Sequence, residues 1–122
     1  METIEFPVIT GTVTTAESVI WPIDGAKADN VGTNLEEYDE ISIGIVNAGG
    51  GSGDSTSAVS IQVSPDNETA HFKELTDLGV IASGGVKTYT ISDNAYKYLR
   101  VTATCGASDT TSESYVIAKR KV

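Results

Sequence analysis

The sequence predicts an all-β protein, a single β-sandwich of about 7–8 strands with jelly-roll or immunoglobulin-like topology. Three observations support this prediction. Apolar and β-branched residues alternate with polar ones at period two in several short runs, as in strands that bury one face. Clusters of Gly, Asn, Asp and Ser separate these runs, and helical patterns are scarce. The length of 122 residues suits one domain, 1–122, with one core.

The alternation marks strands along the whole chain. The segments are 3–9, 17–23, 40–46, 58–64, 86–92, 96–104 and 114–120. In the first of them, Pro7 cannot donate a hydrogen bond to a neighbouring strand, so it marks an edge or an irregular start. In the last, the buried face carries either Val116 and Ala118 or Tyr115 and Ile117.

The same alternation predicts one shared face for each of the other strands. The residues expected on these faces are Ile4, Phe6, Val8, Val19, Trp21, Ile23, Ile41, Ile43, Ile45, Val59, Ile61, Val63, Tyr89, Ile91, Leu99, Val101 and Ala103. The segment 71–79 is interpreted as extended, with Phe72 carried into the core. The alternative is one helical turn that carries Phe72, Leu75 and Leu78.

The run Asn47–Ala58 holds four glycines and no bulky side chain, and it joins the two clearest strands. We therefore predict that segments 41–47 and 58–64 are antiparallel neighbours and that 47–58 is a flexible hairpin loop. A phosphate-binding loop would need lysine after its last glycine, but Asp54 follows Gly53. A linker between domains would leave too short an N-terminal part to form a secure core.

The charge of the chain excludes some partners. A formal net charge of −9, from 17 acidic and 8 basic residues, disfavours nucleic acid, because that affinity rests largely on Lys and Arg that neutralise phosphates. No run approaches the length of a membrane span, so no membrane partner is expected. The first residues lack the features of a signal peptide, and Cys105 is the only cysteine. Both observations favour synthesis in a reducing cytoplasm.

Few residues offer catalytic or metal chemistry. His71 is the only histidine and is expected to be solvated or to cap a turn. Cys105 has no basic neighbour in sequence to activate it and is expected to be a small buried or loop-edge side chain. One His and one Cys do not make a structural zinc site. The sequence predicts no enzyme, no catalytic residue, no cofactor and no metal ion.

Acidic and aromatic residues give three weaker alternatives. The acids of the segment NLEEYDE are Glu36, Glu37, Asp39 and Glu40. Two of them could form a glycosidase pair, and calcium could bind through Asp24, Asp29 or this cluster. We interpret the cluster as a solvated patch that protects a strand edge. Trp21 and the tyrosines could stack on sugars. Because Trp21 lies in an apolar run, we expect it in the core.

A pattern in the second half runs from a strand that ends in Ser64 and Asp66, through Phe72 and Leu75, to the segment YKYLRVTAT at 96–104. Over roughly residues 58–104 it resembles the small β-sandwich proteins of tailed-phage virions. The resemblance implies a capsid decoration (cement) protein on the virion surface, without catalysis. The implied partner is the major capsid protein, with a homotrimer favoured on the virion. The alternative is a glycan-binding module of a tail or fibre component.

Charge asymmetry suggests where such a protein would contact a capsid. Residues 1–40 contain nine acids and a single Lys27, whereas Lys119, Arg120 and Lys121 crowd the C-terminal end. These three cations are the candidate capsid contact, because they can reach a carboxylate patch and Arg can hold one in bidentate geometry. The alternative is a solvated strand end that balances the acidic surface.

Overall fold

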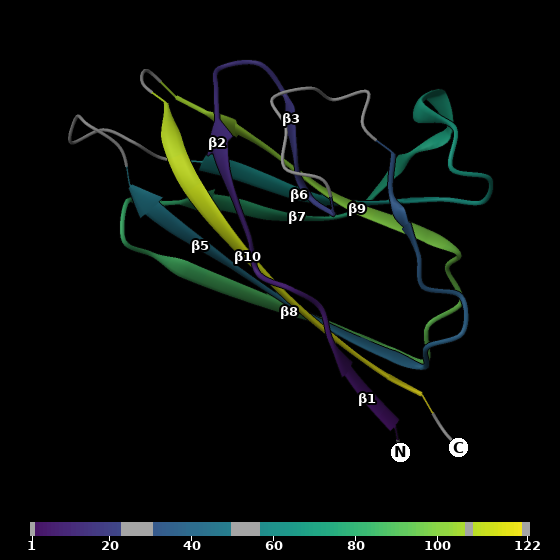
Figure 1. Cartoon of the computed structure of the whole chain (residues 1–122). Helices are drawn as coiled ribbons and strands as arrows, with labels where there is room; N and C mark the ends of the chain where they lie inside the picture. Colours follow the sequence, from purple (N-terminus) through teal and green to yellow (C-terminus); the bar gives the residue numbers. More distant parts are fainter. Residues whose placement is uncertain (1, 23–30, 50–56, 107–108, 121–122) are drawn as a thin grey trace.

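The computed structural model describes residues 2–22, 31–49, 57–106 and 109–120 (Figure 1). Over these ranges the chain forms ten β-strands and one 3-10 turn, η1. Their bounds are β1 Glu2–Glu5, β2 Ile9–Val13, β3 Ser18–Trp21, β4 Thr33–Asn34, β5 Glu40–Gly49, β6 Ser57–Ser64, η1 Thr69–His71, β7 Lys73–Ile81, β8 Val86–Ser92, β9 Tyr98–Cys105 and β10 Thr110–Arg120. The all-β prediction is confirmed. No helix in the described ranges is long and apolar enough to cross a membrane.

The strands form two antiparallel sheets of five strands each. The first has the order β1–β10–β5–β8, with β2 also on β10, and the second has the order β3–β9–β6–β7, with β4 also on β9. Pairs are nested along the chain: β6 with β7, β5 with β8, β3 and β4 with β9, and β1 and β2 with β10. Nested pairs of this kind form when one long antiparallel hairpin folds over so that its strand pairs are divided between two sheets. The topology is therefore a jelly roll rather than an immunoglobulin fold.

The core lies between the two sheets, which Figure 1 shows as two layers. The sequence pattern predicted its main faces correctly. The core residues are Val13, Ile20, Trp21, Leu35, Ile41, Ile43, Ile45, Val59, Ile61, Ile81, Ile91, Leu99, Val101, Ala103, Cys105, Val116 and Ala118. On β10, Val116 and Ala118 are buried while Tyr115 and Ile117 are exposed, which decides between the two possible faces of that strand.

The predicted pairing of segments 41–47 and 58–64 is wrong. β5 lies in the first sheet between β10 and β8, and β6 lies in the second between β9 and β7. Alternation shows which face of a strand is buried, but two strands that bury their faces in one core can belong to opposite sheets. Of the glycine-rich segment 47–58, residues 47–49 extend β5 and 57–58 begin β6. The loop predicted over 47–58 is therefore strand at both of its ends, and its remaining part, 50–56, lies outside the described residues.

The first predicted strand is interrupted. It is divided into β1 and β2 around Pro7, which lacks an N–H group, and both parts pair with β10. Ile4 and Val8, expected to share a face with Phe6, are 40% and 48% exposed. Phe6 is partly buried and meets Trp21 edge-on, with ring centroids 5.6 Å apart. The edge position of β1 leaves its side chains without cover from the second sheet.

The strand β3 departs from simple alternation. All four of its residues are buried, including Ile20, because the register against β9 shifts between Val19 and Trp21. Ile20 therefore enters the core, although period two would place it on the face opposite Trp21. Ile23, the third residue expected on that strand, lies outside the described residues.

The segment 71–79 is extended, as predicted, and forms most of β7 after η1. Phe72, however, is not part of the core cluster. Its ring packs against the guanidinium of Arg100, whose Cζ lies 4.1 Å from the ring centroid. Arg100 is only 4% exposed, and its Nε donates to Gln62 Oε1 at 2.8 Å. Because Arg100 alternates with inward residues of β9, Phe72 covers the outer side of the second sheet.

Candidate functional site

The proposed capsid-contact residues at the end of β10 are paired with acids of this chain. Arg120 Nη2 lies 2.5 Å from Glu2 Oε1, and Nη1 donates to Glu37 Oε2 at 3.0 Å. Lys119 Nζ lies 3.8 Å from Glu40 Oε1. The hydrogen bond to Glu2 is the main cause that raises the pKa of Arg120, so this group stays charged. The positive charge of this strand end is thus balanced within the chain.

The acidic cluster and the basic strand end therefore form one region of the surface. The Asp39 N–H also donates to the Lys119 carbonyl at 2.8 Å, beside the ion pairs. Glu37 and Arg120 are separated by 83 positions, so no local pattern reveals their contact. Lys121, the third cation of the predicted contact, lies outside the described residues. Within the described residues, Lys119 and Arg120 are thus paired with acids of the same chain.

The aromatic residues are dispersed rather than gathered in one sugar-stacking platform. Trp21 is 1% exposed and belongs to the core, as expected. Tyr38 and Tyr89 pack against the core from its periphery. Tyr115 is 41% exposed on β10, and Tyr96 is 37% exposed in the segment before β9. Tyr96 and Tyr115 are therefore exposed on different elements of the fold.

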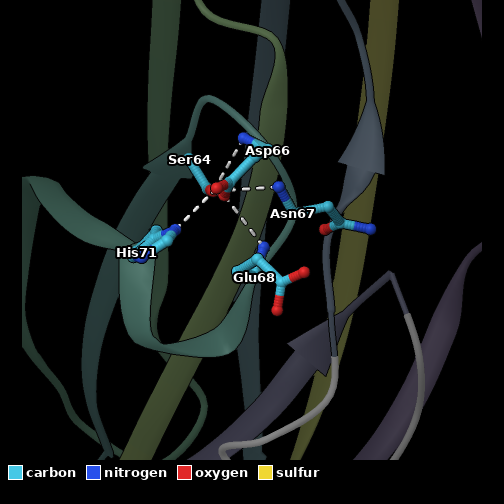
Figure 2. Close-up of polar contacts among 5 residues, drawn as sticks. All are labelled: Ser64, Asp66, Asn67, Glu68 and His71. Carbon is cyan, nitrogen blue, oxygen red and sulfur yellow. Dashed lines mark hydrogen bonds and ion pairs between the residues drawn. The ribbon is translucent and has the colours of Figure 1, made fainter.

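Polar side chains gather in the turn that follows β6 (Figure 2). Asp66 Oδ1 accepts hydrogen bonds from Ser64 Oγ and from the Glu68 N–H, each at 3.1 Å. Asp66 Oδ2 lies 2.6 Å from His71 Nδ1. Ser64 Oγ in turn accepts from the N–H groups of Asp66 and Asn67, at 3.3 and 3.0 Å. The carboxylate of Asp66 thus ties both ends of the turn together.

This arrangement does not activate a nucleophile. In a catalytic triad the histidine lies between the serine and the acid and removes the serine proton. Here Asp66 lies between Ser64 and His71, and Ser64 is 3% exposed. The His71 side chain is 57% exposed and fixes the turn through Asp66, which confirms the expectation of a solvated, turn-capping histidine.

The turn also anchors a distant segment of the chain. Asn67 has a φ of 64°, in the left-handed region that Asn tolerates better than most residues. Its Oδ1 accepts a hydrogen bond from the Gly32 N–H at 2.8 Å. A Cβ on Gly32 would lie 2.6 Å from the Leu99 carbonyl oxygen, so only glycine fits at this close approach. Asp66 thus stabilises the turn itself, and Asn67 connects the turn to the segment at Gly32.

The protonation of Asp66 controls this turn. The hydrogen bond from the Glu68 N–H, and next the bond to His71, lower the pKa of Asp66 from its ordinary value. A lowered pKa in the folded state means that ionised Asp66 stabilises the fold above its unfolded pKa, about 3.9. This stabilisation is lost as the pH falls through the lower, folded pKa.

We expect Asp66→Asn to remove that pH dependence. The free energy of unfolding of the wild type should fall as the pH decreases below about 4, and the variant should lack this component. Urea midpoints measured between neutral pH and acid test the expectation. Glu36→Gln, which changes the net charge equally at an exposed position, is the control. Identical pH profiles for wild type and Asp66→Asn would contradict the role of Asp66.

A cavity of about 360 Å³ opens beside the turn, between the end of β6, the start of β7 and residues 95–97. Its walls include Val63, Pro65, His71, Lys73, Tyr96 and Lys97. No local sequence pattern predicts this cavity, because its residues come from two segments that lie far apart along the chain. The lining combines apolar surface, one aromatic ring and three nitrogen-bearing side chains.

The described ranges contain few side chains that could support metal or thiol chemistry. No group of three or more His, Cys, Asp or Glu side chains there could hold a metal ion. Asp24 and Asp29, the other calcium candidates, lie outside those ranges. Cys105 is a free and buried thiol at the end of β9, as expected.

The sequence matches no protein-family model and no curated protein. Solved structures share the fold. A structure from the disulfide-linked pili of Bacillus endospore appendages has a TM-score of 0.54 at 12% identity, over 98% of this chain and 89% of that chain. PirA has a TM-score of 0.55 at 18% identity, over 93% and 92%. The SPBc2 prophage-derived protein YomS has 0.52 at 9%, over 95% and 93%. At such identities the likeness establishes the fold alone, a small antiparallel β-sandwich.

Proposed function

We propose that this protein is a non-enzymatic structural component of a phage virion, a decoration protein that binds the outer surface of the head through the major capsid protein. The fold is in keeping with this role, since one similar structure comes from a prophage and another from a pilus. The observation that carries the proposal is an uncharged surface on the first sheet, which offers a docking site on a strongly acidic chain.

This surface, called here the uncharged face, is built by two rows of residues across β10, β5 and β8. Residues directly opposite one another in a sheet point to the same side. Register pairs Tyr115 with Gly44 and Gly44 with Thr88, and it pairs Ile117 with Ser42 and Ser42 with Thr90. The uncharged face therefore comprises Ser42, Gly44, Thr88, Thr90, Tyr115 and Ile117. Its rim carries Glu5 of β1, which lies opposite Ile117, and Glu113, which lies in the row beyond Tyr115.

The composition of the uncharged face suits protein docking. Interface cores are depleted in charged residues and enriched in aromatic ones, and Tyr115 and Ile117 are 41% and 36% exposed. Gly44 adds no side chain between Thr88 and Tyr115, and a Cβ there would lie 3.8 Å from Thr88 Cγ2 and 3.9 Å from Tyr115 Cβ. With a net charge of −9, the chain can approach an acidic capsid most easily through such a face.

The basic strand end takes a secondary role in this proposal. Lys119 and Glu40 are paired in the next row of the sheet, so their ion pair lies at the rim of the uncharged face. Rim charges act mainly on the association rate and on its salt dependence. We expect Lys119→Ala to slow binding to heads at low salt and to leave occupancy at high salt unchanged.

A charge placed in the middle of the uncharged face should abolish docking. Gly44 lies in the regular strand β5, and the space around it is open enough for a side chain. We therefore expect Gly44→Arg to fold normally and to lose co-sedimentation with heads of the phage whose genome encodes the chain. The matched control is Ala58→Arg, which adds the same charge at an exposed position of the second sheet.

Two outcomes would overturn the proposal. Absence of wild-type co-sedimentation at low and high salt would reject the decoration role. Normal binding by folded Gly44→Arg would show that the uncharged face is not the docking surface.

On the virion we also propose a homotrimer, since neighbours in a symmetric assembly can cover exposed strand edges. Counting subunits in a reconstruction of decorated heads tests it, and isolated monomers would contradict it.

A further inference from the structure

We infer that the cavity beside the turn between β6 and β7 binds a carboxylated sugar, a hexuronic acid residue of a surface glycan. This inference does not depend on the decoration role, since the cavity and the uncharged face share no residue. It rests on the lining of the cavity and on how the charged groups around it are partnered.

The cavity has the size and the apolar surface of a small-ligand site. Its volume of about 360 Å³ lies near the lower end of the usual range for ligand pockets, about 300–1,000 Å³. Val63 and Pro65 supply apolar wall, and Tyr96, a residue that is 37% exposed, supplies an aromatic ring. A pyranose presents C–H groups on one face, which pack on an aromatic ring, so a sugar matches this part of the lining.

The cations of the cavity are not neutralised in the way that those of β10 are. None of the ion pairs formed by residues in the described part of the chain involves Lys73 or Lys97. The Lys97 amine lies 5.7 Å from the ring centroid of Tyr98, next along the chain. Two of the chain's 8 basic residues thus line one cavity of a chain with an excess of acids. A carboxylate is the group that two such amines would bind.

Two acids near the cavity, Asp66 and Glu74, have partners within the fold. Asp66 is occupied by the turn and by His71, and Glu74 Oε1 accepts from Ser60 Oγ at 2.9 Å. The bond from His71 Nδ1 to Asp66 leaves Nε2 as the remaining hydrogen-bonding atom of a ring that lines the cavity. A sugar hydroxyl both donates and accepts hydrogen bonds, so it can pair with Nε2. The turn thereby positions His71 for a hydroxylated ligand.

Two probes that differ only in the carboxylate test the inference. We expect methyl β-D-glucuronide to shift the NMR signals of Tyr96 and His71 on titration, and to bind at least about tenfold more tightly than methyl β-D-glucoside. Lys73→Gln combined with Lys97→Gln should reduce the glucuronide affinity to that of the glucoside. Tyr96→Ala should weaken both probes, because ring stacking does not depend on the carboxylate. Lys87→Gln, which removes a cation outside the cavity, is the matched control.

Other results would overturn the inference. Equal affinity for the two probes would show that the lysines do not recognise the carboxylate. Inorganic phosphate that shifts the same signals with the same affinity would show a general anion site without sugar recognition. An absence of shifts with glucuronide would reject the site. Loss of glucuronide binding in Lys87→Gln would show a charge effect of the whole surface.

Discussion

Trp21→Ala is expected to lower the free energy of unfolding by about 3–5 kcal/mol, the usual cost of removing a large buried aromatic side chain. Trp21 is 1% exposed at the end of β3, where it lies between the sheets and contacts the edge of Phe6. The substitution leaves a cavity that rigid strands cannot close. Urea unfolding monitored by far-UV circular dichroism measures the loss.

An exposed aromatic residue provides the control for Trp21. Tyr115→Ala also removes a ring, but Tyr115 is 41% exposed on the outer side of β10. We expect it to cost less than about 1 kcal/mol, because little buried surface is lost. A cost for Trp21→Ala no greater than that of Tyr115→Ala would contradict the assignment of Trp21 to the core.

Asn47→Ala is expected to lower the free energy of unfolding by about 2–4 kcal/mol, because it breaks a buried hydrogen-bond network. Asn47 is fully buried near the end of β5. Its Nδ2 donates to the Ile81 carbonyl at 2.8 Å, and its Oδ1 accepts from the Gly49 N–H at 2.9 Å and from Thr110 Oγ1. Alanine would leave these three groups without the side-chain partner that the amide supplies.

An exposed polar pair provides the comparison for Asn47. Ser42 and Thr90 hydroxyls lie 3.4 Å apart on the solvent side of β5 and β8. Ser42→Ala should change stability by no more than about 0.5 kcal/mol, since water replaces the lost contact. If thermal or urea unfolding gave Asn47→Ala the same small effect, the network at the end of the sandwich would not stabilise the fold.

Sequence reasoning succeeded where burial follows directly from alternation. On β5, Ile41 and Ile43 bury one face while Ser42 and Gly44 remain on the other, as period two requires. Alternation does not show which strands are hydrogen-bonded to each other. It therefore could not show that β5 and β6 belong to different sheets. Nor could it show the irregular register of β3, which buries Ile20 as well as Trp21.

The site residues were harder to predict because they depend on contacts between distant segments. The pattern with Ser64 and Asp66 was visible, but the bond from Asp66 to His71 depends on how the turn closes. The cavity joins this turn to Tyr96 and Lys97, which come from the segment before β9. The sequence showed a cluster of cations that includes Lys119. Only the strand register shows that Glu40 lies opposite Lys119.

Labelling of engineered cysteines in free and head-bound protein tests whether the uncharged face docks on the phage head. Cys105 is buried, so maleimide would report on an added thiol at Thr88→Cys on the uncharged face or at Ala58→Cys on the second sheet. We predict that both thiols react in the free protein and that only Thr88→Cys becomes protected on heads. Unchanged labelling of head-bound Thr88→Cys, with protection of Ala58→Cys, would contradict the claim.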